Sequence, residues 1–389
     1  MSENINIFYI GQDDLIELLA TSICSVCDNT SSFVDFYILD CGICGLNKRK
    51  LEDLKLQFDN FELNFLKIDL NVFNGLKKYK GFSDFWSKLL IPELTPTLNK
   101  AIYLDTDTVI LDDIKLLWEQ DLENYPLGAV PATYYDKWRD DAFNAVYPKT
   151  DKWLFINTGM LLIDCDKWRE NSITENILQL CKKYNDVLDV AVGYDEAMVS
   201  LYFENNFKVL DCRFNLSDHE NHLKEFEPFY NDIYIDNEWE NIVIRHYAGS
   251  DKPWVCLRND YDGNILKNYN AFWFYVKMTP FVIGLYQRFK EHLMSSILGN
   301  SPNFIKIKNK YKLFNLIPVF YVIETATRIK YKLFKFIPLL TIKKMPHKLK
   351  YKLFGFVQIL TVRLDEKVKK YKLFGFIQIL TKRTKVYDI

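Results

Sequence analysis

The chain has 389 residues, of which 49% are hydrophobic and 16% aromatic, a composition that allows a sizeable buried core and excludes a mainly disordered protein. Its net charge of −1 conceals an asymmetry, because residues 1–300 carry a net charge of −18 and residues 301–389 a net charge of +17. The two regions are therefore expected to have different partners.

The N-terminus and the apolar runs bear on the cellular compartment. The first residues, MSENINIFYIGQDD, contain no basic stretch followed by an apolar one, so no secretory signal is expected. No run of about 18 uncharged apolar residues occurs, which argues against a membrane-spanning helix. We therefore expect a cytoplasmic protein whose contact with the membrane would be peripheral, at its inner face.

Strand-like and helix-like segments alternate over the first hundred residues. Short, β-rich apolar segments predict strands, and each of the first three is followed by a segment with the spacing of an amphipathic helix. This alternation predicts an α/β fold with a Rossmann-like, mostly parallel sheet flanked by helices on both faces. The expected strands are 5–11, 33–40, 62–69 and 100–105, and the expected helices are 13–27, 46–58 and 83–94.

Two Cys-x-x-Cys pairs have a spacing close to that of a zinc ribbon. Cys24 and Cys27 lie late in a helical segment, whereas Cys41 and Cys44 follow a strand-like run. Zinc knuckles usually lie in tight turns, so we interpret these cysteines as buried or half-buried free thiols.

The segment AIYLDTDTVILDDI (101–114) places two carboxylates at the end of an apolar strand. Asp105 and Asp107 lie two positions apart, so they point the same way and can reach one divalent cation. Open α/β sheets bind ligands at that edge. A solvated turn is one alternative, and the nucleophile loop of a haloacid-dehalogenase-type phosphatase is another. Three strand–helix units precede the loop and no later paired-Asp metal loop is evident, which argues against the phosphatase.

The second half supplies a candidate third ligand for the cation. In IRHYAGSDKPW (244–254), His246 can ligate a metal, Gly249 allows close approach of backbone to phosphate, and Lys252 offers a positive charge to leaving oxygens. A lone histidine is more often structural, so the prediction of a nucleotide-sugar transferase depends on the whole motif. Further expected strands are 126–132, 154–164, 207–211 and 241–247, and further expected helices are 173–184 and 194–205.

Residues 7–254 resemble glycosyltransferase family 8, the retaining GT-A transferases that include bacterial lipooligosaccharide galactosyltransferases and glycogenin. The stretches KAIYLDTDTVILDDI, FINTGMLLIDCDKW and HYAGSDKPW occur in the order and spacing of that family. The resemblance implies a GT-A domain over residues 1–275, a UDP-hexose donor carrying galactose or glucose, and a glycan or glycolipid acceptor in bacterial cell-surface polysaccharide synthesis.

The resemblance also implies how the nucleotide and the metal are held. Asp105, Asp107 and His246 would bind Mn²⁺, with Mg²⁺ as the alternative, on the diphosphate of UDP, and Gly249 and Lys252 would lie at the phosphates. Lys252 and the metal would then carry most of the catalysis.

Further positions match residues that contact the donor in this family. Asp13 and Asp14 match acidic residues at uracil and ribose, Asn157 and Gly159 match the stretch that touches the sugar, and Asp195 matches an aspartate that binds sugar hydroxyls. The alternative for Asp195 and the following Glu196 is an exposed first turn of a helix, where acids suit the helix dipole.

Several positions depart from the family pattern. Lys88 stands where the family usually has a helix arginine, and Glu196 stands where glutamine is frequent. Ala132 and Ala197 replace residues that are often acidic. A glutamate at position 196 allows a covalent glycosyl-enzyme route. We favour front-face attack, with Glu196 stabilising positive charge. A catalytically inactive, membrane-bound sugar-nucleotide-binding protein is the non-enzyme alternative.

The C-terminal region is an internal repeat with a period of twenty residues. Units beginning Lys-Tyr-Lys-Leu-Phe start at Lys310, Lys330, Lys350 and Lys370. The apolar residues are dense and irregular, so we expect short helices over 310–389, joined to the first domain by a helical segment over 276–309. Basic and apolar residues together predict binding to an anionic membrane surface. A solenoid or a protein partner is the alternative, and nucleic acid is not expected because the aromatics alternate with Leu and Ile.

Overall fold

The chain forms two compact units, residues 1–289 and 290–389. The computed structural model describes residues 4–79, 81–134, 154–188, 193–217, 241–248, 252–254, 263–287 and 289, and eight strands between 307 and 383. Each unit contains its own β-sheet. Residues 290–306 of the expected connecting segment lie outside the described residues, as does Gly249.

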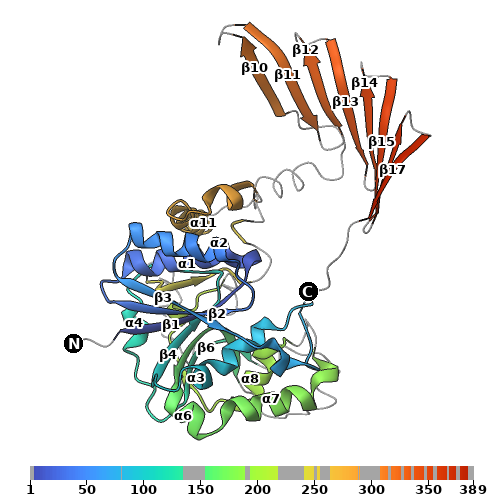
Figure 1. Ribbon diagram of the computed structural model, residues 1–389. Helices are drawn as coiled ribbons and strands as arrows, with labels where there is room; N and C mark the ends of the chain where they lie inside the picture. Colours follow the sequence, from blue (N-terminus) through green and yellow to red (C-terminus); the bar gives the residue numbers. More distant parts are fainter. Residues whose placement is uncertain are drawn as a thin grey trace. The chain divides into compact units, whose positions relative to one another are not determined.

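A seven-stranded sheet of order β3-β2-β1-β4-β7-β6-β8 forms the centre of the first unit (Figure 1). The strands β1 to β4 run parallel, whereas β7 runs antiparallel to both β4 and β6. This arrangement confirms the expected α/β fold with a mostly parallel sheet. The strands are β1 (Ile5–Gly11), β2 (Val34–Asp40), β3 (Phe61–Lys67), β4 (Lys100–Leu104), β6 (Leu127–Tyr134), β7 (Leu154–Asp164) and β8 (Lys208–Val209).

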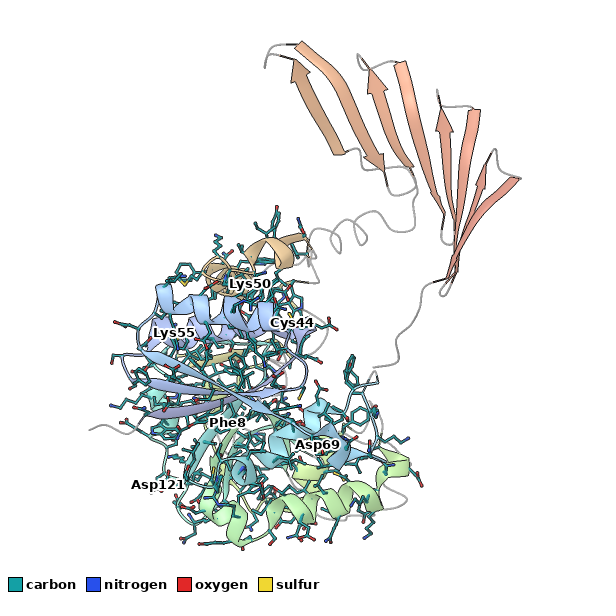
Figure 2. All side chains as sticks on the ribbon, in the orientation of Figure 1. Phe8, Cys44, Lys50, Lys55, Asp69 and Asp121 are labelled. Carbon is teal, nitrogen blue, oxygen red and sulfur yellow. The ribbon has the colours of Figure 1, made fainter. Side chains whose placement is uncertain are left out.

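Helices cover both faces of this sheet (Figure 1). On one side lie α1 (Ile16–Asn29), α2 (Gly45–Glu52) and α11 (Gly263–Val276), and on the other lie α3 (Ile91–Leu94), α6 (Cys165–Glu170), α7 (Ile173–Lys183) and α8 (Asp195–Phe203). Because both faces are covered, every residue of β1 is buried, and Phe8 within it is fully buried (Figure 2).

Short elements complete the first unit. The expected helix over 83–94 is a 3₁₀ helix followed by the single turn of α3, where Pro92 lies in the first turn and lacks an N–H donor. That 3₁₀ helix is η4 (Asp84–Leu90), and the remaining short helices are α4 (Lys115–Trp118), η1 (Asp13–Leu15), η2 (Asp53–Leu56), η3 (Leu70–Phe73), η6 (Asn185–Val187) and η7 (Cys212–Phe214).

A two-stranded ribbon lies directly after the acidic pair. Strand β5 (Thr108–Ile110) pairs antiparallel with β9 (Ile244–His246), and Thr108 lies opposite His246. The side chain of Ser25 on α1 accepts a hydrogen bond from the N–H of Ile110 at 2.9 Å. This polar contact holds β5 on α1, and the pairing with β9 brings His246 beside the acidic loop.

The two Cys-x-x-Cys pairs do not converge. Cys24 and Cys27 are buried in α1, and burial raises the pKa of Cys24 to about 12 and that of Cys27 further. Burial likewise raises the pKa of Cys41 to about 12, whereas Cys44 is exposed at the start of α2 (Figure 2). Metals bind thiolates, so the neutral buried thiols are poor ligands.

The second unit corrects the expectation of short helices. Its repeats form an eight-stranded antiparallel sheet in chain order, with two strands from each repeat. Segments such as Arg-Ile-Lys-Tyr-Lys-Leu alternate polar and apolar residues, which is the period of a strand, and the dense apolar block that follows obscured this pattern. The strands are β10 (Ile307–Leu313), β11 (Ile317–Thr325), β12 (Arg328–Leu333), β13 (Ile337–Met345), β14 (Lys348–Leu353), β15 (Val357–Asp365), β16 (Val368–Leu373) and β17 (Ile377–Arg383).

In the part of the chain that the structure describes, no helix has both the length and the apolar character needed to cross a bilayer.

Candidate active site

The acidic pair lies at the carboxyl end of β4, as the sequence predicts. The N–H of Asp105 donates to the carbonyl of Gly159 on β7 at 2.8 Å. The N–H of Tyr247, just after β9, donates to the carbonyl of Asp107 at 2.9 Å. Backbone from two distant segments therefore fixes the loop that carries both carboxylates.

Asp105, Asp107 and His246 converge, and one ligand atom from each lies within 4.8 Å of the others. The Nε2 atom of His246 lies 3.3 Å from Oδ1 of Asp107 and 3.9 Å from Oδ2 of Asp105. Within the described residues this is the single group of three such side chains. Two carboxylates and an imidazole can ligate one divalent cation, so the donor set fits such an ion.

Lys252 lies against the same loop. Its Nζ forms an ion pair with Asp107 and donates to the carbonyl of Tyr247 at 2.7 Å. Burial alone would raise the pKa of Asp107, but Lys252 and His246 hold it well below its usual range. Asp107 is therefore a stable carboxylate, and Lys252 is a positive charge at the edge of the candidate metal site.

Lys88 is the buried cation of the site. Its Nζ lies 2.7 Å from Oδ2 of Asp195 and 3.6 Å from Oδ1 of Asp105. Burial opposes its charge, but the two carboxylates raise the pKa of Lys88 above its usual value. The lysine therefore stays charged and links the loop after β4 to the start of α8.

Asp195 and Glu196 form the first turn of α8 and are half-buried. The hydroxyl of Thr158 donates to Asp195 at 2.7 Å, and the amide of Asn157 donates to Glu196 at 3.0 Å. Burial, with the charge of Asp195 next in importance, raises the pKa of Glu196 to about 8. Both acids thus have partners within the site, unlike the acids of an exposed helix start.

A cavity of about 440 Å³ adjoins the acidic loop. Asp14, Asp105, Asp107 and Lys252 line it, together with the aromatic rings of Tyr79, Phe82, Phe85, Tyr103 and Trp254. Asp13 does not line this cavity. Its carboxylate accepts hydrogen bonds from the N–H of Cys44 and the amide of Asn47, each at 2.9 Å, and these bonds lower its pKa.

Some residues of the site were not expected from the sequence. The hydroxyl of Tyr103 donates to Oδ1 of Asp105 at 2.5 Å. Its position two residues before Asp105 on the same strand is a signal that could have found it. Asn215 also belongs to the site, because its side chain lies 2.9 Å from Nδ1 of His246. It lies in no motif, so the sequence offers no comparable signal.

Gly159 has a steric reason to be glycine. A Cβ atom at this position would lie 2.2 Å from Cε1 of His246, which is inside the contact distance. The imidazole ring therefore packs directly against the backbone of β7. This close approach connects the Asn-x-Gly motif to the candidate metal site.

Comparison with known proteins supplies the family. The sequence model of glycosyl transferase family 8 matches residues 6–257. The chain belongs to glycosyltransferase family 8. One relative is a Haemophilus influenzae protein named as a glycosyltransferase. It is 28% identical to this family 8 chain over 273 residues, which cover 68% of this chain and 78% of the relative. Glycosyltransferase GlyF of Streptococcus pneumoniae is 30% identical over 229 residues, which span 57% of this chain and 50% of GlyF.

Solved structures support the same fold. The galactosyltransferase LgtC, determined with donor and acceptor sugar analogues, superimposes with a TM-score of 0.57 at 20% identity, over 71% of this chain and 96% of LgtC. The GT-A architecture expected for a family 8 transferase is thereby confirmed. Family membership decides against the phosphatase, and the Asp-Asp-His group is the candidate metal site of a glycosyltransferase.

Proposed function

We propose that this chain is a metal-dependent, retaining hexosyltransferase that moves galactose or glucose from a UDP-sugar to a glycan or glycolipid acceptor. The observation that carries the proposal is the convergence of Asp105, Asp107 and His246 beside a cavity of about 440 Å³. That volume is typical of small-molecule sites. Carboxylates and imidazole at its edge suit a cation that bridges a diphosphate.

A divalent cation held by these three side chains would neutralise the charge that grows on the departing diphosphate. Lys252 brings a second positive charge to the same edge, through its ion pair with Asp107. Such charges are worth more in a partly buried site than in water. Gly249, proposed to lie at the phosphates as well, is outside the described residues.

The remaining site residues are assigned to the donor. Asp13 and Asp14 are proposed to contact uracil and ribose, and Asn157, Gly159 and Asp195 the transferred sugar. Lys88 is proposed to lie between nucleotide and sugar, and its ion pair with Asp195 at 2.7 Å supports a position next to the sugar-binding acid.

Glu196 decides between two routes of retaining transfer. We propose front-face attack, in which the leaving phosphate oxygen accepts the proton of the acceptor and Glu196 stabilises positive charge at the anomeric carbon. Either role needs the ionised carboxylate, and because the pKa of Glu196 is raised to about 8, both become more effective as the pH rises towards that value. A mass increase of one hexose on Glu196, measured on intact protein mixed with donor, would contradict front-face attack.

The C-terminal repeats are proposed to bind an anionic membrane surface, at the inner face of the cell membrane. Residues 301–389 carry a net charge of +17, and each Lys or Arg near an anionic leaflet contributes about 1 kcal/mol. Attachment there would bring the transferase to a lipid-linked acceptor for cell-surface polysaccharide synthesis.

A panel of UDP-sugars tests the function without knowledge of the acceptor, because slow transfer to water releases UDP. We expect UDP release with UDP-galactose or UDP-glucose that depends on Mn²⁺ and is lost in Asp107→Asn. A protein that binds these donors with Mn²⁺ but releases no UDP from any of them would instead be the sugar-nucleotide-binding alternative.

A further inference from the structure

Asn215 lies in the middle of a row of side chains that links His246 to Glu196. It follows η7 and is 5% exposed. Its Oδ1 lies 2.9 Å from Nδ1 of His246, and its Nδ2 donates to Oδ1 of Asn157 at 2.9 Å. The Nδ2 of Asn157 in turn donates to Oε1 of Glu196 at 3.0 Å.

One backbone group sets the direction of the whole row. The N–H of Gly159 can only donate, and it donates to Oδ1 of Asn157 at 3.0 Å. With its oxygen there, Asn157 receives its second hydrogen bond from the amino group of Asn215. The oxygen of Asn215 then faces His246, and because an amide oxygen only accepts, Nδ1 of His246 must carry a hydrogen.

Gly159 itself has little freedom to move. Its carbonyl accepts the N–H of Asp105 at 2.8 Å, just beyond the Leu104–Met160 pair that ends the pairing of β4 with β7. Its Cα side contacts the imidazole ring of His246 so closely that a Cβ has no room. The ring is therefore held near Cε1 by Gly159 and at Nδ1 by Asn215.

We infer that Asn215 is a positioning residue. It keeps the ring hydrogen of His246 on Nδ1 and, through its hydrogen bond to Asn157, fixes the orientation of Glu196 relative to His246. With that hydrogen on Nδ1, Nε2 is the nitrogen left to ligate a cation, and it lies 3.3 Å from Oδ1 of Asp107. Metal-bound histidines use the nitrogen without hydrogen, and a partner at the other nitrogen fixes that choice. The inference rests on the proposed metal-dependent transfer.

Titration of the full-length chain with Mn²⁺ alone tests the first half of the inference. Asn215→Leu should weaken Mn²⁺ binding by about 10- to 100-fold, the usual effect of losing a partner of a metal ligand. The control is Asn60→Leu, which removes two amide hydrogen bonds elsewhere in the first unit and should leave Mn²⁺ affinity unchanged. A folded Asn215→Leu variant that binds Mn²⁺ like the wild type would overturn the inference.

The variant Asn215→Asp distinguishes the contact of residue 215 with His246 from its contact with Asn157. Its carboxylate still accepts the Nδ1 hydrogen but has no hydrogen to donate to Asn157. We expect Mn²⁺ affinity to be retained while the rate of UDP release at saturating donor falls. Loss of Mn²⁺ affinity together with the rate, or no change in either, would contradict the assignment.

Histidine nitrogen NMR of the wild type needs no variant of Asn215 and no turnover. Ring ¹⁵N–¹H spectra at alkaline pH, with His246 assigned by its loss in His246→Gln, should show the hydrogen on Nδ1. A hydrogen on Nε2 would overturn the inference even if Asn215→Leu fails to fold. If the spectra and Mn²⁺ titrations agree with the inference but no UDP-sugar is turned over, the proposed function fails and the positioning role stands.

Discussion

Asp107 forms an ion pair with Lys252 and lies 3.3 Å from Nε2 of His246, and Lys252 above all holds the pKa of Asp107 low. Asp107→Asn keeps the shape of the side chain but removes a metal ligand and an ion pair. Because a catalytic cation contributes several kcal/mol, initial rates of Mn²⁺-dependent UDP release should fall at least about a hundredfold. The exposed Asp59→Asn should retain full activity, and equal rates in the two variants would contradict the role of Asp107.

The raised pKa of Glu196 has a consequence for stability. In the unfolded chain the carboxyl ionises near 4.5, whereas in the folded chain it stays protonated up to about pH 8. Stability should therefore fall between these values, by at most about 1.4 kcal/mol per pH unit, because the folded state binds the extra proton.

Glu196→Gln removes this dependence. In metal-free buffer, its melting temperature relative to the wild type should be unchanged near pH 4.5 and should rise steadily towards pH 8. Thermal unfolding across this range measures the difference, with the exposed Glu170→Gln as a control that should show no such trend. A constant difference between Glu196→Gln and the wild type would show that Glu196 does not titrate as described.

At the scale of elements, the three-residue strand β5 depends on α1 for its position. The N–H of the fully buried Ile110 donates to the hydroxyl of Ser25. Ser25→Ala would leave this N–H without that acceptor, at a cost of about 1–3 kcal/mol in the free energy of unfolding. Denaturant titration measures the loss. Thr21→Ala on the same helix, whose hydroxyl bonds only to the helix carbonyl of Glu17 among the contacts described, should cost less. Equal losses would argue against a bridging role for Ser25.

The central elements were predictable because their signals are local. Apolar residues mark the strands β1 to β4, and β1, β2 and β3 are each followed by a helical pattern, so strand type and order follow from the sequence. β5 was not expected, because a three-residue strand has too few positions to show a period. The strands of the repeats were mistaken for helices, because an alternating half and a dense apolar half share each unit.

The site was predictable where motifs carry it. Asp105, Asp107 and His246 were named from the order of their motifs, and the pairing of β5 with β9 brings them together. Asn215 could not be predicted in this way, because only the folded structure brings it beside His246. The hydrogen bond from the N–H of Cys44 to Asp13 likewise joins segments 31 residues apart, which no local pattern reports.

At the scale of the whole molecule, the charge asymmetry predicts separable activities. A chain ending at Phe289, the boundary between the two units, lacks the basic repeats. In flotation assays the full-length chain should bind anionic vesicles, less so at high salt, whereas the shortened chain should not. The shortened chain should still release UDP from a UDP-sugar. Equal flotation of the two chains would exclude the repeats as the membrane contact.

The account depends on a cation held by Asp105, Asp107 and His246 that receives the diphosphate of UDP. Calorimetric titration of UDP into the full-length chain, with Mn²⁺ and then with a chelator, tests this most directly. We expect UDP to bind with Mn²⁺, and to bind at least about tenfold more weakly with the chelator or in His246→Gln. Equal UDP affinity with and without Mn²⁺ would contradict the account.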